Sequence, residues 1–106
     1  HGHANALALP HVLKACLAES ETALAELAVV TNVSDVASPA ARAQAFIEAV
    51  QDLIAKVGIA ETDSRIQPAD WTVLAHAAMD ESDGYVSPRL LSKAEIMDTL
   101  KRITAR

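Results

Sequence analysis

The fold is decided by residues 38–59, which read SPAARAQAFIEAVQDLIAKVGI. Ser38 is a favoured N-cap residue and Pro39 suits the first helical position, so the stretch has a defined start. Gly58 suits the left-handed position past a helix end, and apolar Ile59 follows it as a Schellman-type end requires. The apolar residues that repeat at helical spacing between these ends are Phe46, Ile47, Val50, Leu53, Ile54 and Val57. The stretch therefore predicts an amphipathic helix.

Two more helices are expected before this one. Residues 4–17 carry an apolar stripe, and Pro10 inside it predicts a kink or a short first turn rather than two separate helices. The stripe consists of Leu9, Val12, Leu13, Cys16 and Leu17. Ser20 is the expected N-cap of the second helix, and residues 32–38 are expected to form a loop. The expected inward-facing residues of that second helix are Leu24, Leu27 and Ala28.

Two further helices are expected after residue 59. Pro68 opens the first of them, and its expected buried face consists of Trp71, Leu74, Ala75 and Ala78. Residues 80–89 are acidic and contain a glycine and a proline, so they are not expected to continue a helix. Ser92 and Glu95 then form a capping box before the last helix. Its apolar positions are Ile96, Leu100 and Ile103.

The composition supports an all-α fold. The 106 residues include 22 alanines but only 3% aromatic residues, which favours closely packed helices over sheets. No strand pattern competes with the helical ones. We therefore predict a bundle of about five helices that forms a single domain over residues 1–106.

The charge balance and the cysteine count exclude several classes of partner. Nine basic and 14 acidic residues give a net charge of −5, so no basic stripe is available for nucleic acid or an anionic membrane. No apolar run approaches the roughly 18 residues that span a bilayer. The single Cys16 excludes an internal disulfide framework and fits a reducing compartment, so we expect a cytoplasmic protein.

The four histidines are the first candidates for metal ligation. His1 and His3 flank a glycine, and together they could chelate a divalent metal. Two ligands without a nearby carboxylate or thiolate make a weak, open site, and an affinity tag would leave the same residues. His11 and His76 fall at helical positions and are interpreted as packed or surface side chains.

Other chemical signals have simpler interpretations. The acidic residues 80–84 lack the alternating ligands and the final glutamate of a calcium loop, so they are interpreted as a solvated loop. Cys16 lies in an apolar stripe and is interpreted as a small core residue. Three glycines leave no dinucleotide-binding fingerprint. We therefore expect no complete active site in this chain.

Three segments carry a resemblance to a known family. Residues 1–12 read HGHANALALPHV, residues 57–59 read VGI, and residues 87–89 read SPR before the last expected helix. They resemble, in order, the His-Gly-x-x-Asn-Ala-x-x-x-Pro-His-Val signature, the Val/Leu-Gly-Ile/Leu step and the Asn-Pro-Arg motif of the iron-containing (group III) alcohol dehydrogenases. The resemblance covers all 106 residues in order.

This resemblance implies a place within a larger enzyme. Family members have an N-terminal nucleotide-binding α/β domain and a C-terminal all-helical domain of the dehydroquinate synthase-like type. One aspartate and three histidines hold iron or sometimes zinc, and His1 matches the last of these histidines. The other ligands and the segment that binds NAD or NADP lie upstream in the family. The metal polarises the alcohol or aldehyde oxygen, and the nicotinamide exchanges a hydride.

The sequence also departs from the family pattern. His3 stands where the family commonly has a small apolar residue, and Ser87 replaces the asparagine of the Asn-Pro-Arg motif. Asp83 stands where the family often has a cysteine. Asn5 matches the signature and lies one helical turn after His1, where it would help to order the metal ligand.

These observations lead to one preferred function and two alternatives. The preferred function is the helical, metal-side portion of an iron-type NAD(P)-dependent alcohol dehydrogenase. Such a portion would lack the nucleotide-binding domain and would bind neither metal nor nucleotide alone. The first alternative is a free-standing helical module for protein interaction or self-association as a homo-oligomer. The second is a small metal-binding protein that uses His1 and His3.

Overall fold

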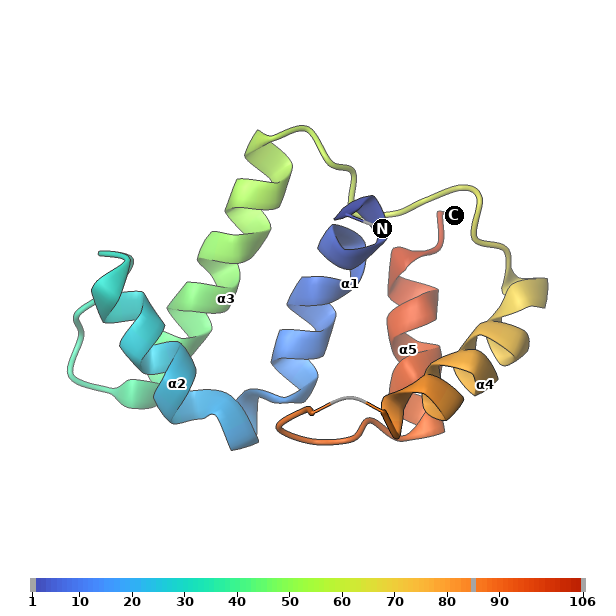
Figure 1. The fold of residues 1–106 in the computed structure, drawn as a ribbon. Helices are drawn as coiled ribbons and strands as arrows, with labels where there is room; N and C mark the ends of the chain where they lie inside the picture. The colour runs from blue at the N-terminus through green and yellow to red at the C-terminus, as the bar shows by residue number, and fades with distance from the viewer. Residues whose placement is uncertain (1, 85, 106) are drawn as a thin grey trace. The chain divides into compact units, whose positions relative to one another are not determined.

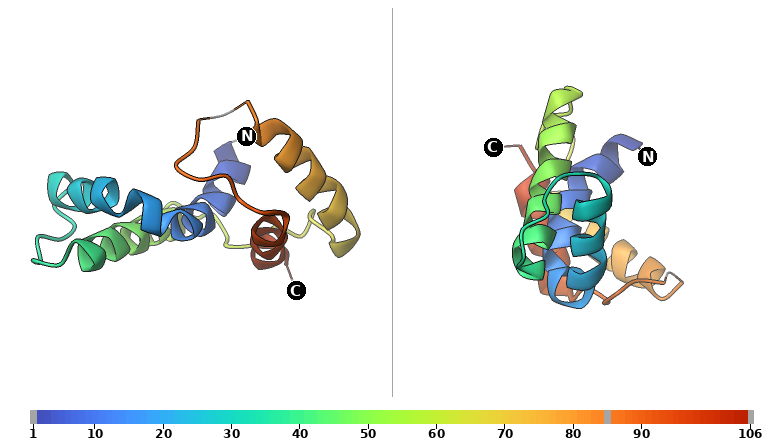
Figure 2. Two further views of the ribbon diagram at one scale, coloured as in Figure 1. Left: turned by 90° about the horizontal axis from the view of Figure 1, so that it is seen from below. Right: turned by 90° about the vertical axis from the view of Figure 1, so that its left-hand side faces the viewer.

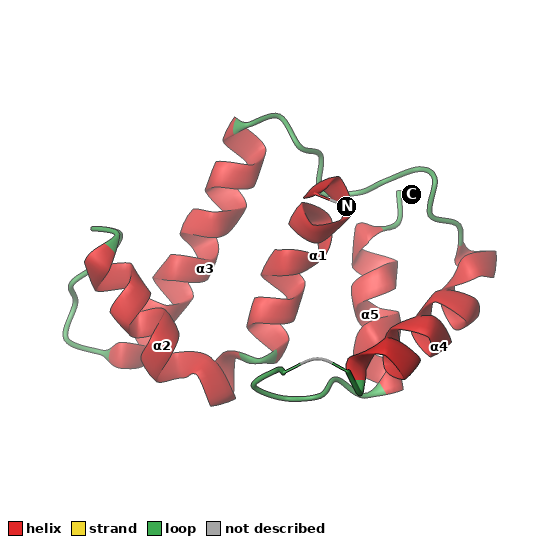
Figure 3. Cartoon of the chain, viewed as in Figure 1, coloured by secondary structure: helices red, strands yellow, loops and turns green. Residues whose placement is uncertain are grey.

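The structure is a computed structural model that describes residues 2–84 and 86–105. Its regular elements are α1 (Gly2–Ala15), α2 (Leu17–Val30), α3 (Pro39–Lys56), the 3-10 turn η1 (Pro68–Asp70), α4 (Trp71–Ser82) and α5 (Lys93–Ile103). Within the described ranges every regular element is a helix, as Figure 3 shows, and the predicted all-α class is confirmed. None of these helices combines the length and the apolar character needed to cross a bilayer.

The chain is divided by its contacts into two compact units, His1–Ile59 and Ala60–Arg106. The first unit contains α1, α2 and α3, and the second contains η1, α4 and α5 (Figure 1). The expected single domain over residues 1–106 stays a prediction.

The ends of α3 follow the sequence signals. The Ser38 hydroxyl accepts a hydrogen bond from the Ala41 amide at 3.2 Å, and Pro39 occupies the first turn. At the other end Gly58 has a φ of +83°, a value that suits glycine. The amide of Gly58 donates to the Ala55 carbonyl, and the amide of Ile59 donates to the Ile54 carbonyl. This pair of bonds is a complete Schellman end, as predicted.

The start of α2 differs from the prediction. The helix begins at Leu17, three residues before the expected N-cap Ser20. The Cys16 amide donates to the Val12 carbonyl and the Ser20 amide donates to the Cys16 carbonyl, both at 3.0 Å, so helical bonding continues through the junction. Ser20 is therefore a helix-interior residue, because its amide already has an intrahelical partner.

The end of α2 has a signal that the sequence analysis missed. Asn32 has a φ of +58°, and the amide of Val33 donates to the Ala28 carbonyl at 2.9 Å. Asparagine is the residue that most often replaces glycine at this left-handed position. Residues 32–38 then form the predicted loop.

The core of the first unit lies between α2 and α3, which run side by side in both views of Figure 2. Its buried members are Leu24, Ala43 and Ile47, against which Leu13, Leu17 and Phe46 pack. Ala28 of α2 is also fully buried. The expected inward-facing residues in the middle of each helix, Leu24 and Ala28 of α2 and Ile47 of α3, are therefore confirmed as buried.

The sequence pattern predicts more buried residues on each helix than the structure has. Four apolar residues expected to point inward are exposed: Leu9, Leu27, Leu53 and Val57. Leu53, for example, retains 61% of its accessible surface. In a unit of three helices each helix is covered along a narrow strip only, so the outer members of an apolar stripe stay in solvent.

In the second unit the start of α4 and the end of α5 are tied together. The Trp71 indole Nε1 donates to the Thr104 hydroxyl at 2.9 Å, and that hydroxyl donates to the Leu100 carbonyl at 2.6 Å. Lys101 Nζ lies 5.7 Å from the centroid of the Trp71 ring. The amide of Asp63 donates to the Ile103 carbonyl at 2.8 Å. Residues far apart in the sequence therefore meet beside one indole.

Several predictions about α4 need correction. Pro68 opens the 3-10 turn η1, and the α-helix itself begins at Trp71. Residues 80–82, expected outside a helix, form its last turn because the glycine and the proline come later. On the expected buried face only Ala75 is buried, while Leu74 and Ala78 are exposed. α4 packs against α5, and Ala75 is the one residue of α4 that is fully buried.

Gly58→Ala should lower the free energy of unfolding by about 1–2 kcal/mol, because an L side chain is strained at positive φ. An added Cβ at Gly58 meets nothing within 4 Å, so the loss would come from the backbone alone. Gly84→Ala is the matched control, since its Cβ would make only an ordinary contact at 3.5 Å with the Glu81 carbonyl. Urea unfolding followed by circular dichroism measures both. Equal stability of the two variants would contradict the left-handed turn.

Thr104→Val should destabilise the second unit by about 1–2 kcal/mol, because it leaves the indole N–H without its acceptor. Trp71 is the only tryptophan, so its fluorescence reports this unit during urea unfolding. Thr99→Val is the control, because it removes a similar hydroxyl-to-carbonyl bond to Glu95 in the same helix and keeps the indole pair. If both variants unfold at the same urea concentration, the indole bond contributes nothing measurable.

Candidate functional site

The expected metal ligand His1 lies outside the described residues. Its neighbours His3 and Asn5 are on the first turns of α1, and both are exposed. The role of His1 as a ligand and the ordering role of Asn5 therefore stay predictions.

Metal donors do not gather elsewhere in the described part of the chain. Across residues 2–84 and 86–105, no group of three or more His, Cys, Asp or Glu side chains is arranged to hold an ion. Stable protein sites for transition metals use three or four such ligands. The described residues thus do not fit a complete metal centre.

The remaining histidines and the cysteine are placed as their simpler interpretations predict. His11 is half-buried on α1, and His76 is exposed on α4. Cys16 is a free cysteine that retains only 4% of its accessible surface, at the junction of α1 and α2. Its interpretation as a core residue is confirmed.

The acidic residues 80–84 lie at the exposed end of α4. The Ser82 hydroxyl donates to the Met79 carbonyl at 2.7 Å, so it serves as a local helix-end contact. A helical turn directs successive side chains about 100° apart and cannot wrap them around one ion. The solvated character is confirmed, whereas the expected loop conformation is replaced by helix in residues 80–82.

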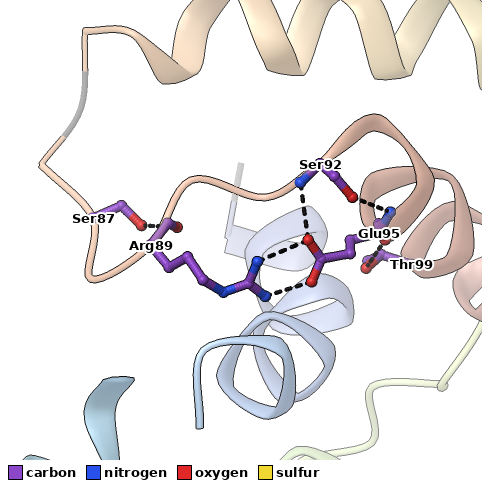
Figure 4. Close-up of polar contacts among 5 residues, drawn as sticks. All are labelled: Ser87, Arg89, Ser92, Glu95 and Thr99. Carbon is purple, nitrogen blue, oxygen red and sulfur yellow. Dashed lines mark hydrogen bonds and ion pairs between the residues drawn. The ribbon is translucent and has the colours of Figure 1, made fainter. Parts of the chain in front are cut away.

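The best-defined polar cluster joins the Pro-Arg segment to the start of α5 (Figure 4). Arg89 presents both terminal nitrogens to the Glu95 carboxylate: one bonds Oε1 at 2.8 Å and the other bonds Oε2. This two-pronged arrangement gives directional as well as electrostatic attraction. About a third of each side chain remains accessible, so water screens the pair in part.

The same carboxylate belongs to the predicted capping box. The Ser92 amide donates to Glu95 Oε1 at 3.0 Å, and the Glu95 amide donates to the Ser92 hydroxyl at 3.2 Å. The Ser87 hydroxyl donates to the Arg89 carbonyl at 2.8 Å and braces the loop before the pair. The capping box is therefore confirmed, and it also anchors the loop that carries Arg89.

The surroundings of Glu95 favour its charged form. The hydrogen bonds from Arg89, and next the one from the Ser92 amide, lower the pKa of the Glu95 carboxyl from its ordinary value of 4.5 to about 2. Because the pKa is lower in the folded chain, the stabilisation is complete above the ordinary value and is lost as the pH falls from about 4.5 to about 2. The cluster holds a loop to a helix, and its geometry is that of a structural anchor.

The partnership between Arg89 and Glu95 was not predicted from the sequence. A usable signal was present, because a capping-box glutamate is held at the helix start with one carboxylate oxygen still free to accept. An arginine in the preceding loop is a natural donor to that oxygen. The path of residues 83–91 decides whether the two meet, and no local pattern specifies that path.

Glu95→Gln should leave the capping hydrogen bonds but remove the charge that Arg89 pairs with. We expect the variant to unfold at lower urea than the parent at about pH 6. The difference should shrink as the pH falls from about 4.5 to about 2, because the carboxyl protonates in the unfolded parent before it protonates in the folded parent. Trp71 fluorescence follows the same unit. Glu26→Gln, an exposed change on α2, is the control. A pH-independent difference would mean that the ion pair does not stabilise the fold.

Comparison with known proteins identifies the family. The model of the C-terminal part of the Fe-containing alcohol dehydrogenase family matches residues 1–104. No curated protein and no solved structure matches the chain. The match covers nearly the full length of the chain, and the all-helical fold is consistent with it. The chain therefore belongs to the Fe-containing alcohol dehydrogenase family and corresponds to its C-terminal part.

Proposed function

We propose that the chain is the helical, metal-side portion of an iron-type NAD(P)-dependent alcohol dehydrogenase. The observation that carries this proposal is the family match over residues 1–104. The opening segment supports it, since His1 stands where the family signature begins with a metal-binding histidine. The single cysteine fits a cytoplasmic enzyme.

The proposed activity requires a second domain. His1 would supply one imidazole, and a nucleotide-binding domain would supply the aspartate, the two other histidines and the site for NAD or NADP. One imidazole cannot hold iron or zinc against water, because affinity in such sites comes from several ligands fixed together.

The purified 106-residue chain should neither turn over alcohols nor bind Fe²⁺ or Zn²⁺ at micromolar concentration. The test is an assay of a panel of primary alcohols with NAD and NADP, together with calorimetric titration of each metal. Turnover above a metal-only blank would overturn the dependence on a second domain.

In the chain joined to its nucleotide-binding domain, His1→Ala should remove tightly bound metal and lower alcohol oxidation by orders of magnitude. His3→Ala is the matched control, because it removes an imidazole two residues further along the chain and should leave the metal content unchanged. Metal content is measured by mass spectrometry after dialysis. Equal metal loss in both variants would argue for a two-histidine chelate, and retention in both would exclude His1 as a ligand.

An exposed apolar area on the second unit offers a test between this proposal and a free-standing module. Val73 on α4 retains 71% of its accessible surface, and Leu74 beside it is also exposed. A portion that functions beside another domain is expected to expose such apolar area, whereas an independent module has a polar surface or buries the area in a homo-oligomer.

The 106-residue chain should therefore bind a hydrophobic dye, and Val73→Lys should reduce the dye signal without lowering the free energy of unfolding. Thr72→Lys is the control, since it adds the same charge at the neighbouring exposed position. Dye fluorescence and analytical ultracentrifugation are measured together. A stable dimer that binds no dye would favour the self-association module over the dehydrogenase portion.

A further inference from the structure

No further inference is drawn: the strongest candidate, the exposed apolar face that Val73, Leu74, Ala77 and Ala78 form on α4, carries nothing because nothing in the structure shows what covers it.

Discussion

The close approach of α2 to α3 is the constraint on which the first unit depends. Ala28 and Ala43 are fully buried, and Leu24 and Ile47 share the same core. A methyl group at two of these positions lets the helices approach closely enough for the larger side chains to interlock. A chain rich in alanine thereby obtains a packed core in which Phe46 is the one aromatic side chain of the described residues that packs against the buried cluster. Because several of the buried side chains are alanines, the core is small. The turns at the helix ends therefore fix much of the path of the chain.

Three helix ends that carry a local sequence signal were predicted correctly, whereas the left-handed Asn32 at the end of α2 was not predicted. Ser38, Gly58 and the Ser92–Glu95 box act through bonds within a few residues, so local sequence is sufficient to place them. The start of α2 could not be placed in this way, because Cys16 makes no side-chain cap and helical bonding passes through it. Where a helix begins without a side-chain cap, a nearby residue that favours caps, such as Ser20, predicts the wrong start.

Burial was harder to predict than helix position. An apolar stripe shows which face of a helix turns inward, but the number and size of its neighbours decide how wide the covered strip is. Leu53 and Leu74 lie on correctly identified helices and remain exposed for this reason. The family was recognised through the motif that begins at His1. The Arg89–Glu95 ion pair could not be predicted, because it depends on the path of the loop before α5, and residue spacing does not determine that path.

The buried thiol of Cys16 can report how often the first unit opens. Its thiol is the only one in the chain and lies almost entirely inside the unit, so an oxidant or an alkylating reagent must wait for the unit to open locally around it. The rate of thiol modification would then measure how often the unit opens around Cys16. Exposure to air should likewise link two chains through a disulfide only as fast as that opening permits.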